Sequence, residues 1–468
     1  MEWFTAPGYA LSRLVLLRLL AAVYLVGFVA AARQFRALLG EHGLLPIPRY
    51  LRYRGWRDAP TLFQWHYSDR FFAAVSWGGA ALSAAICAGL ADLVPLWASM
   101  LLWALLWVLY LSIVNVGQTW YSFGWESLLL EAGSLAVFLG NAKVAPPFTV
   151  LLLFRWLLFR VEFGAGLIKL RGDRCWRDLT CLKYHHETQP MPGPFSWYFH
   201  HLPLPLHKVE VAANHVAQLG FPVLLFTPQP VASVAAGAMV ATQLWLVVSG
   251  NFAWLNWLTI TLAFSALRLP GGTSGSRSAP IWFEVLVLLF TALVVVLSWW
   301  PARNLLSREQ LMNFSFNRLH LVNTYGAFGS INRIRFEVVL EGTEDAVPTA
   351  DSVWREYGFK GKPGDVRRRP RQYAPYHLRL DWLMWFAGIS PSYARPWLRT
   401  FADRLLAGDP ATLRLLRHNP FPDHPPRWVR AVLYRYRFTT RAERRASGAW
   451  WHREPLRTYL APMGSLDS

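Results

Sequence analysis

The chain has 468 residues, of which 54% are hydrophobic and only 16% are charged. Soluble domains carry about 25% charged residues, so this composition excludes a purely soluble protein and indicates an integral membrane protein. The 47 Lys and Arg residues outnumber the 28 Asp and Glu residues, which gives a net charge of +19. We expect no nucleic acid partner, because the Arg residues near the C-terminus are scattered among acidic ones. A position beside the lipid bilayer explains the charge more simply.

Several segments are long and apolar enough to cross a membrane as a helix, which takes about 20 residues. Six windows meet this test clearly: residues 14–32, 71–91, 93–114, 148–170, 231–249 and 281–301. Three weaker windows are short or contain acidic residues: 123–140, 209–226 and 252–267. The sequence therefore predicts a polytopic α-helical membrane protein with about seven to nine transmembrane helices.

The composition changes near residue 302, after the last apolar window. Alternation of apolar and polar residues favours strands around residues 333–340 and 431–439, and helices suit residues 380–386 and 396–406. We therefore predict an extramembrane α+β domain outside the bilayer. The predicted division is a transmembrane domain at 1–302, with basic connections at 33–70 and 171–208, and a C-terminal domain at 303–468.

Ionisable side chains within the apolar windows are costly unless they are paired, so they mark structural or functional sites. Arg155, Glu162 and Lys169 follow one another at seven-residue intervals and share one face of a helix. Facing Glu126, this stripe would neutralise itself inside the bundle. The buried polar cluster that we predict comprises Glu126, Glu131, Arg155, Arg160, Glu162 and Lys169. It either holds a substrate or a proton or, as the simpler interpretation, fixes helix packing through ion pairs.

The connection at 171–208 is rich in histidine, but no metal-binding motif accompanies these residues, so we predict no metal and no cofactor. Cys175 and Cys181 can form a local disulfide if the connection faces an oxidising compartment, and free thiols are the alternative. The chain also lacks the nucleophile elbow of lipases, a Walker A loop and a dinucleotide fingerprint. Its motifs therefore do not indicate an enzyme.

Several longer motifs occur together in this chain. Residues 163–173 read FGAGLIKLRGD, followed by CWRDLT at 175–180 and ETQP at 187–190; WESLLLE occupies 125–131, NTYGAFG 323–329 and LDWLMW 380–385. Together they resemble the lipase maturation factor family, and the resemblance covers about residues 40–455. The residues of the motif loop are Gly166, Lys169, Arg171, Gly172, Asp173, Cys175, Trp176, Arg177, Asp178, Glu187, Gln189 and Pro190.

The resemblance implies a membrane protein of the endoplasmic reticulum that helps secreted lipases to fold and assemble, by binding rather than by catalysis. It also implies a lumenal C-terminal region that contacts the lipase client. The positive-inside rule, applied to nine spans, would instead place that region in the cytoplasm, and here we follow the resemblance. A bacterial member would lie in the cytoplasmic membrane. Candidate client contacts are Tyr325, Phe328, Trp382 and Trp385, and the alternative is that they fill the domain's own core.

A shorter part of the same motif, from Phe163 to Leu170, is also similar to the membrane region of vitamin K-dependent carboxylase-like proteins. That resemblance implies a membrane-embedded enzyme acting on a small or lipidic substrate, with Lys169 as a base in a pocket lined by Glu126 and Glu131. The two hypotheses differ at Lys169, because an always-charged Arg cannot replace a catalytic base.

Overall fold

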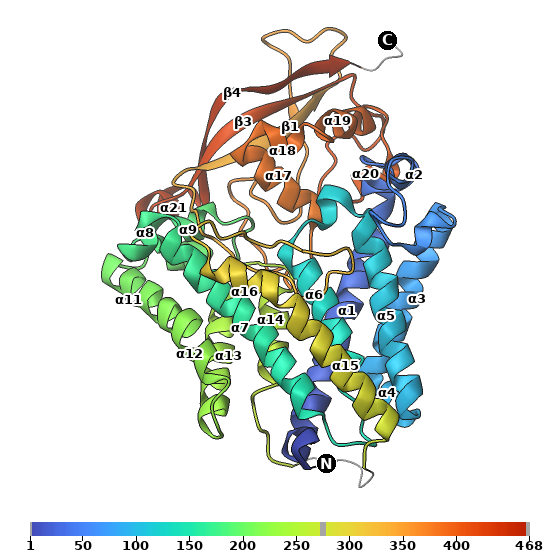
Figure 1. The fold of residues 1–468 in the computed structure, drawn as a ribbon. Helices are drawn as coiled ribbons and strands as arrows, with labels where there is room; N and C mark the ends of the chain where they lie inside the picture. The colour runs from blue at the N-terminus through green and yellow to red at the C-terminus, as the bar shows by residue number, and fades with distance from the viewer. Residues whose placement is uncertain (1, 272–277, 465–468) are drawn as a thin grey trace.

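The structure is a computed structural model, and it describes residues 2–271 and 278–464. Long helices form one end of the molecule, and a small sheet with its own short helices forms the other end (Figure 1). The first long helix begins at the lower end of the view and the last strand lies at the upper end. The chain is therefore built as a helix bundle covered at one end by its C-terminal residues.

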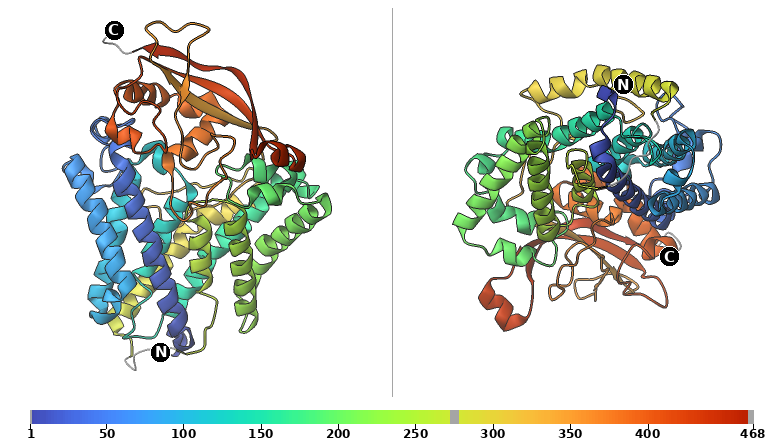
Figure 2. Two further views of the ribbon diagram at one scale, coloured as in Figure 1. Left: turned by 180° about the vertical axis from the view of Figure 1, so that it is seen from behind. Right: turned by 90° about the horizontal axis from the view of Figure 1, so that it is seen from below.

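The helical region alternates long helices with short ones (Figures 1 and 2). The longer helices are α1 (Ala10–Leu38), α3 (Asp69–Ala88), α5 (Leu96–Val116), α6 (Gly124–Ala136), α7 (Phe148–Arg171), α11 (Leu204–His215), α13 (Val231–Ser249), α14 (Leu255–Ala263), α15 (Ile281–Leu297) and α16 (Trp299–Leu306). The shorter helices are α2 (Ile47–Leu51), α4 (Leu90–Leu93), α8 (Arg174–Arg177), α9 (Leu182–Thr188), α10 (Ser196–His200) and α12 (Phe221–Leu224). Single 3₁₀ turns occupy Glu2–Phe4, Pro7–Tyr9, Leu62–Gln64 and Gln118–Tyr121, and Val216–Gly220 forms a π-helical turn.

Among the described residues, five helices are long and apolar enough to cross a membrane, by length and composition: Pro7–Leu38, Asp69–Ala88, Leu96–Val116, Val231–Ser249 and Ile281–Leu306. They correspond to five of the six clear windows in the sequence. Helix α15 has an exposed apolar face, as expected of a helix in contact with lipid, since Ile281, Leu289 and Val296 are 79%, 63% and 70% exposed. The prediction of an α-helical membrane protein is thereby confirmed.

The described helices give five candidate spans by this measure rather than the predicted seven to nine. Helix α7 has 24 residues but carries four buried ionisable side chains. Helices α6 and α14 have 13 and 9 residues; at 1.5 Å per residue they are roughly 20 and 14 Å long, too short for a hydrocarbon core of about 30 Å. The window at 209–226 is interrupted by the π-helical turn. The apolar residues of α6 and α14 are mostly buried within the protein, whereas the window at 209–226 leaves Val209, Val216 and Val223 exposed.

Both basic connections lie at the end of the bundle that carries the C-terminal sheet. Helix α2, within residues 33–70, lies beside α20, and α8 and α9, within residues 171–208, lie near α21 (Figure 1). Glu187 of α9 accepts a hydrogen bond of 2.7 Å from the backbone N–H of Phe438 at the end of β3. The basic connections and the C-terminal sheet therefore share one side of the bundle, and α1 begins on the other.

The C-terminal sheet is antiparallel with strand order β2-β1-β3-β4. Its strands are β1 (Arg335–Thr343), β2 (Arg355–Glu356), β3 (Trp428–Phe438) and β4 (Trp451–Gly464), and its helices are α17 (Arg379–Ile389), α18 (Pro391–Ala394), α19 (Leu398–Leu406), α20 (Pro410–Leu413) and α21 (Arg441–Ser447). Strands β1 and β3 follow the two alternating segments of the sequence and pair with Val338 opposite Leu433. Helix α17 lies against β1, where a Cβ on Gly388 would collide with the carbonyl of Phe336.

One continuous hydrophobic core joins the helix bundle to the C-terminal region. The ring centroids of Trp120 and Trp397 are 5.4 Å apart, and those of Trp125 and Trp382 are 4.8 Å apart. Burying side chains of this size stabilises the contact by roughly 1.5–3 kcal/mol each. The predicted domain boundary at residue 302 falls within α16. The C-terminal sheet is thus packed on the bundle and is not merely tethered to it.

Candidate functional site beneath the C-terminal domain

Glu126, in the first turn of α6, pairs with a residue of the C-terminal region. Arg379 of α17 donates a hydrogen bond of 2.6 Å from Nη1 to Oε1 of Glu126, and both side chains are fully buried. The hydroxyl of Tyr110 donates to Oε2 at 2.5 Å, and Nδ1 of His377 lies 3.6 Å from Oε1. The carboxylate is therefore neutralised at the junction between the bundle and the sheet.

Glu131, five residues further along α6, lies in a second buried ion pair, with Arg160 of α7. The backbone N–H of Asn323 and the hydroxyl of Tyr325 each donate to Oε2 of Glu131 at 2.8 Å. Nη1 of Arg160 in turn donates to the carbonyl of Asn323 at 2.5 Å. Residues that follow position 302 therefore contact both carboxylates of α6, those of Glu126 and Glu131.

Glu162 and Lys169 form a third group that is linked by amides. Glu162 accepts hydrogen bonds from Gln243 at 2.6 Å and from Gln218 at 3.2 Å. Lys169 donates from Nζ to Oε1 of the same Gln218 at 2.8 Å. Gln218 lies in the π-helical turn, which approaches α7 closely enough that a Cβ on Gly166 would contact the Gln218 side chain at 2.9 Å.

The predicted arrangement of the stripe on α7 differs from the structure in one respect. Glu126 does not face Arg155, Glu162 and Lys169, because its partner is Arg379, which the sequence leaves 253 positions away. Arg155 donates to the carbonyls of Ser265 and Leu225 and to the hydroxyl of Tyr9. The six residues of the cluster are all buried, but they divide among separate groups along α6 and α7.

The motif loop packs against residues 328–335, so its sequence pattern reflects contacts with the C-terminal region. Asp173 forms an ion pair of 2.7 Å with Arg333, and Trp176 donates from Nε1 to the carbonyl of Phe328 at 2.7 Å. A Cβ on Gly172 would collide with the carbonyl of Gly329. The remaining contacts are Arg171 with Gln310 and the Leu305 carbonyl, Arg177 with the Leu170 carbonyl, Asp178 with Arg174, and Arg335 with the carbonyls of Glu187, Gln189 and Pro190.

Cys175 and Cys181 are joined by a disulfide in this loop. They form a small core of their own with Trp176, Leu182 and Val211 of α11, among others. Cys87, on α3, is a free thiol. The disulfide therefore closes the loop on the side of the bundle that carries the C-terminal sheet.

The aromatic residues that the sequence offered as client contacts lie inside the protein. Tyr325 and Trp382 are each 4% exposed, and Trp382 belongs to an aromatic cluster with Phe123 and Trp125. Phe328 and Trp385 are partly buried, and Nε1 of Trp385 donates to the carbonyl of Thr188 at 3.0 Å. Their position corresponds to the alternative that they fill the core, so they offer little surface to a partner.

These contacts hold the C-terminal region against α6, α7 and the motif loop. A buried charge is stable when an opposite charge and hydrogen bonds accompany it, as they do at Glu126 and Glu131. The geometry favours an ion-pair network that fixes packing over a site for a substrate or a proton. Arg379, Asn323, Gln218 and Gln243 are partners of these groups whose roles the sequence did not indicate, although Asn323 opens the motif at 323–329. Only Gln243 carried a local signal, since it interrupts an otherwise apolar window.

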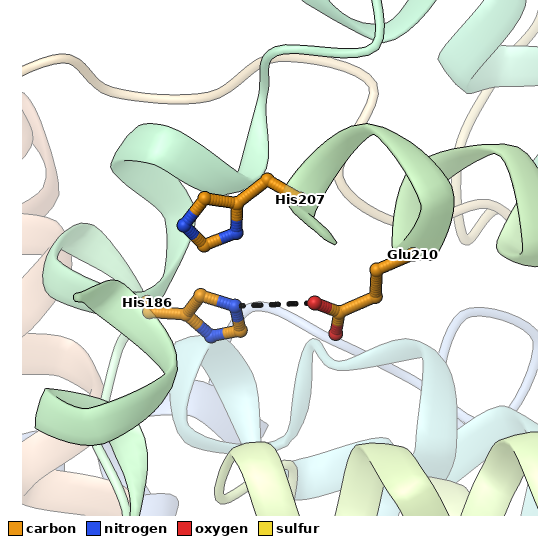
Figure 3. Close-up of side chains that lie close together, drawn as sticks. All are labelled: His186, His207 and Glu210. Carbon is orange, nitrogen blue, oxygen red and sulfur yellow. Dashed lines mark ion pairs between the residues drawn. The ribbon is translucent and has the colours of Figure 1, made fainter. Parts of the chain in front are cut away.

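A further polar group lies beside the motif loop. His186 of α9 and His207 and Glu210 of α11 each direct one metal-binding atom towards the others, within 4.8 Å (Figure 3). Nε2 of His186 is 3.9 Å from Oε2 of Glu210. The histidines come from different helices, which explains why no linear motif marked them.

Comparison with known proteins identifies the family to which this chain is related. The model of the lipase maturation factor transmembrane domain matches residues 11–269, and that of the lipase maturation factor C-terminal domain matches residues 321–461. The chain belongs to the lipase maturation factor family. It is 44% identical to lipase maturation factor 1 of Bos taurus, over 99% of this chain and 90% of that protein, and 42% identical to the Homo sapiens protein, over 97% and 88%. Lipase maturation factor 2 of Gallus gallus is 31% identical, over 96% and 80%.

Family membership confirms the resemblance found in the sequence and the role of a membrane maturation factor. The comparisons give no support to the more distant resemblance to carboxylase-like proteins or to a specifically bacterial type, and they do not favour the membrane enzyme. No solved structure matches the chain. The motif loop lies within the matched transmembrane domain, and Asn323, Tyr325 and Arg379 lie within the matched C-terminal domain. The groups around Glu126 and Glu131 therefore join the two parts by which the lipase maturation factor family is defined.

Proposed function

We propose that this chain is a membrane-anchored folding factor that binds a secreted lipase while the lipase folds and assembles, without catalysis of its own. The observation that carries the proposal is the 44% identity with bovine lipase maturation factor 1 over 99% of the chain. The rigid attachment of the C-terminal sheet to the bundle supports it, because a client bound there is held at the membrane surface. A folding lipase exposes apolar surface that such a factor can cover.

In this proposal the C-terminal region faces an oxidising compartment. The disulfide between Cys175 and Cys181 lies on the same side of the bundle as the sheet, and disulfides persist in the lumen of the endoplasmic reticulum or in the periplasm. The charge of the C-terminal domain does not oppose this orientation, since long segments are translocated largely regardless of charge. The short basic connections at 33–70 and 171–208 do oppose it by the positive-inside rule, and here we follow the disulfide and the family. The protein then lies in the endoplasmic reticulum membrane, as its family implies, or in the cytoplasmic membrane if its source is bacterial.

We place the client contact on an exposed hollow between α10 of the connection at 171–208 and α21 of the C-terminal region. Its volume is about 470 Å³, and it is lined by Trp197, Tyr198, His201, Arg441, Arg444 and Arg445. The guanidinium of Arg444 lies 3.6 Å from the ring centroid of Trp450. Trp, Tyr and Arg are the residues enriched at the centres of protein interfaces. The charge of the hollow fits an acidic segment with apolar neighbours on the surface of a partly folded lipase.

Deleting and restoring the gene tests the proposed function. The measurement is the specific activity, per folded and secreted molecule, of the extracellular lipases of the source organism. We expect that activity to fall while lipase synthesis is unchanged, and to return on complementation. If every secreted lipase keeps its specific activity in the deletion strain, the proposed function is wrong.

Complementation with charge-reversed variants tests the surface. Arg444→Glu should fail to restore lipase activity and should lose copurification with the client. Arg399→Glu changes an exposed residue of α19 in the same way, and it should restore activity. If both variants restore lipase activity equally, the client contact does not lie in this hollow. That result would leave the proposed function itself unaffected.

A further inference from the structure

His186 is a buried imidazole that the fold leaves without hydrogen bonds. It is 2% exposed, and neither of its ring nitrogens has a hydrogen-bond partner among the described residues. The ring stacks on Phe199 at a centroid distance of 5.5 Å. An unsatisfied buried polar group costs about 1–3 kcal/mol, so a stable fold is expected to give this side chain a partner.

The groups nearest to His186 are those that coordinate transition metals. His207 is also 2% exposed, its Nδ1 has no partner among the described residues, and its ring centroid lies 5.8 Å from that of His186. Glu210 follows three residues later on α11, so both side chains leave the same face of that helix (Figure 3). One atom from each of the three residues lies within 4.8 Å of the other two.

The carboxylate of Glu210 is held by a neighbouring helix. Nε1 of Trp245 on α13 donates to Oε1 at 2.7 Å, which leaves Oε2 facing Nε2 of His186 at 3.9 Å. Hydrogen bonds of this kind orient the ligands of metal sites and strengthen them. In a tetrahedral zinc site with Zn–N bonds of about 2.0–2.1 Å, the ligand atoms are about 3.3 Å apart. Small side-chain rotations would close the present spacing to that value.

We propose that His186, His207 and Glu210 bind one divalent transition metal ion of the zinc class. Two imidazoles and one carboxylate form a ligand set that zinc uses with a fourth position left for water. The ion links α9 to α11, and Val211, next to Glu210, already packs on the disulfide between Cys175 and Cys181. The metal and the disulfide therefore fasten the same loop. This metal site does not depend on the lipase client. The proposal of the metal site and the proposed function can therefore be tested separately.

Metal binding is tested on the full-length chain in detergent, after any histidine tag has been removed and the protein has been treated with a chelator. Zinc added to this protein should bind at one equivalent per chain. Co²⁺ in its place should give the visible absorption of a four-coordinate ion with nitrogen ligands. A chain that binds no zinc under these conditions, or that shows no such Co²⁺ absorption, overturns the proposal.

Variants identify the ligands. His186→Ala and Glu210→Gln should each abolish stoichiometric binding, and Trp245→Phe should weaken it by about 10–100-fold. His201→Ala is the matched control, because His201 lies in the same connection and its Nδ1 is 2.7 Å from the carbonyl of Trp197; it should bind zinc as the parent does. The milder Glu210→Gln and Trp245→Phe variants keep the test valid if His186→Ala does not fold. Unchanged zinc affinity in a folded Glu210→Gln variant would overturn the assignment.

Discussion

Arg379 and Glu126 form a fully buried ion pair of 2.6 Å between the C-terminal region and the membrane bundle. The guanidinium of Arg379 also lies 3.5 Å from the ring centroid of Tyr121, and its Nη1 donates to the carbonyl of Trp120 at 2.7 Å. Replacing such a pair with apolar residues can leave stability unchanged, but removing one partner leaves an uncompensated charge. The pair therefore specifies how the two parts of the protein meet.

Arg379→Met should lower the free energy of unfolding by about 3–5 kcal/mol, because Glu126 remains buried without its cation. The double variant Arg379→Met with Glu126→Gln should lose less than the sum of the two single variants. Equilibrium unfolding in detergent measures these differences. Arg174→Met breaks an exposed pair with Asp178, of 3.2 Å, and should cost less than about 1 kcal/mol. Additive effects of Arg379 and Glu126 would show that the two residues are not coupled.

The sequence identified both members of the Glu131–Arg160 pair, but of the Glu126–Arg379 pair it identified only Glu126. Glu126 and Glu131 could be singled out because an acidic residue in an apolar segment needs a partner. Arg379 could not, since its surroundings in the sequence are those of an ordinary helix start and the contact spans 253 positions. The role of Tyr325 was likewise open, because a buried aromatic and an exposed binding residue look alike in a sequence.

The difference between local and long-range properties also explains which transmembrane helices could be predicted. Helix α15 could be predicted because it is long and apolar apart from Glu284, which is a local property. Helices α6 and α14 also contain apolar stretches, but these helices are buried in protein. The periodicity of apolar residues alone does not show whether a helix is surrounded by protein or by lipid. Strand β4 was missed because Pro455 and a run of exposed residues hide the alternation typical of strands.

Acid should destabilise the junction through His377. This side chain is fully buried beside Glu126, and burial, followed by the positive charge of Arg379, lowers the pKa of His377 to about 4. In the unfolded chain, His377 takes up a proton near pH 6.5, whereas in the folded chain it does so only near pH 4. The folded state is therefore most stable, with respect to this group, above pH 6.5, and it loses stability as the pH falls towards 4. The loss amounts to about 1.4 kcal/mol per pH unit over that range, or about 3 kcal/mol in all.

His377→Asn removes the titrating group and keeps an acceptor for the Nε1 of Trp125, which lies 3.4 Å from Nδ1 of His377. The variant should therefore lose less stability than the parent between pH 6.5 and 4, as measured by equilibrium unfolding at several pH values. His42→Asn, at an exposed position, serves as the control. Parallel stability curves for the parent and His377→Asn would contradict the assignment.

The oxidation state of the motif loop can be read directly. Protein taken from membranes, denatured without reduction and alkylated, should carry the label at Cys87 alone among its three cysteines. Mass spectrometry should recover Cys175 and Cys181 as a linked peptide. Replacing both with Ser should lower the free energy of unfolding by about 2 kcal/mol, the value expected for a short closed loop. Labelling of all three cysteines would place this loop in a reducing compartment and would reverse the proposed orientation.

Lys169 separates the maturation factor from the enzyme hypothesis. Its Nζ donates to Gln218 at 2.8 Å and lies 5.0 Å from the ring centroid of Trp176, and Gln218 in turn donates to Glu162. Lys169→Arg keeps the positive charge and should preserve most of the lipase-activating function, at a packing cost of about 1–3 kcal/mol. Lys169→Met should lose function, because Gln218 and Glu162 then lack a cation. The measurement is the specific activity of the secreted lipase, normalised to the amount of each variant in the membrane. Complete loss of function in a Lys169→Arg variant that unfolds at the parent's temperature would instead identify Lys169 as a base, since a guanidinium cannot give up its proton.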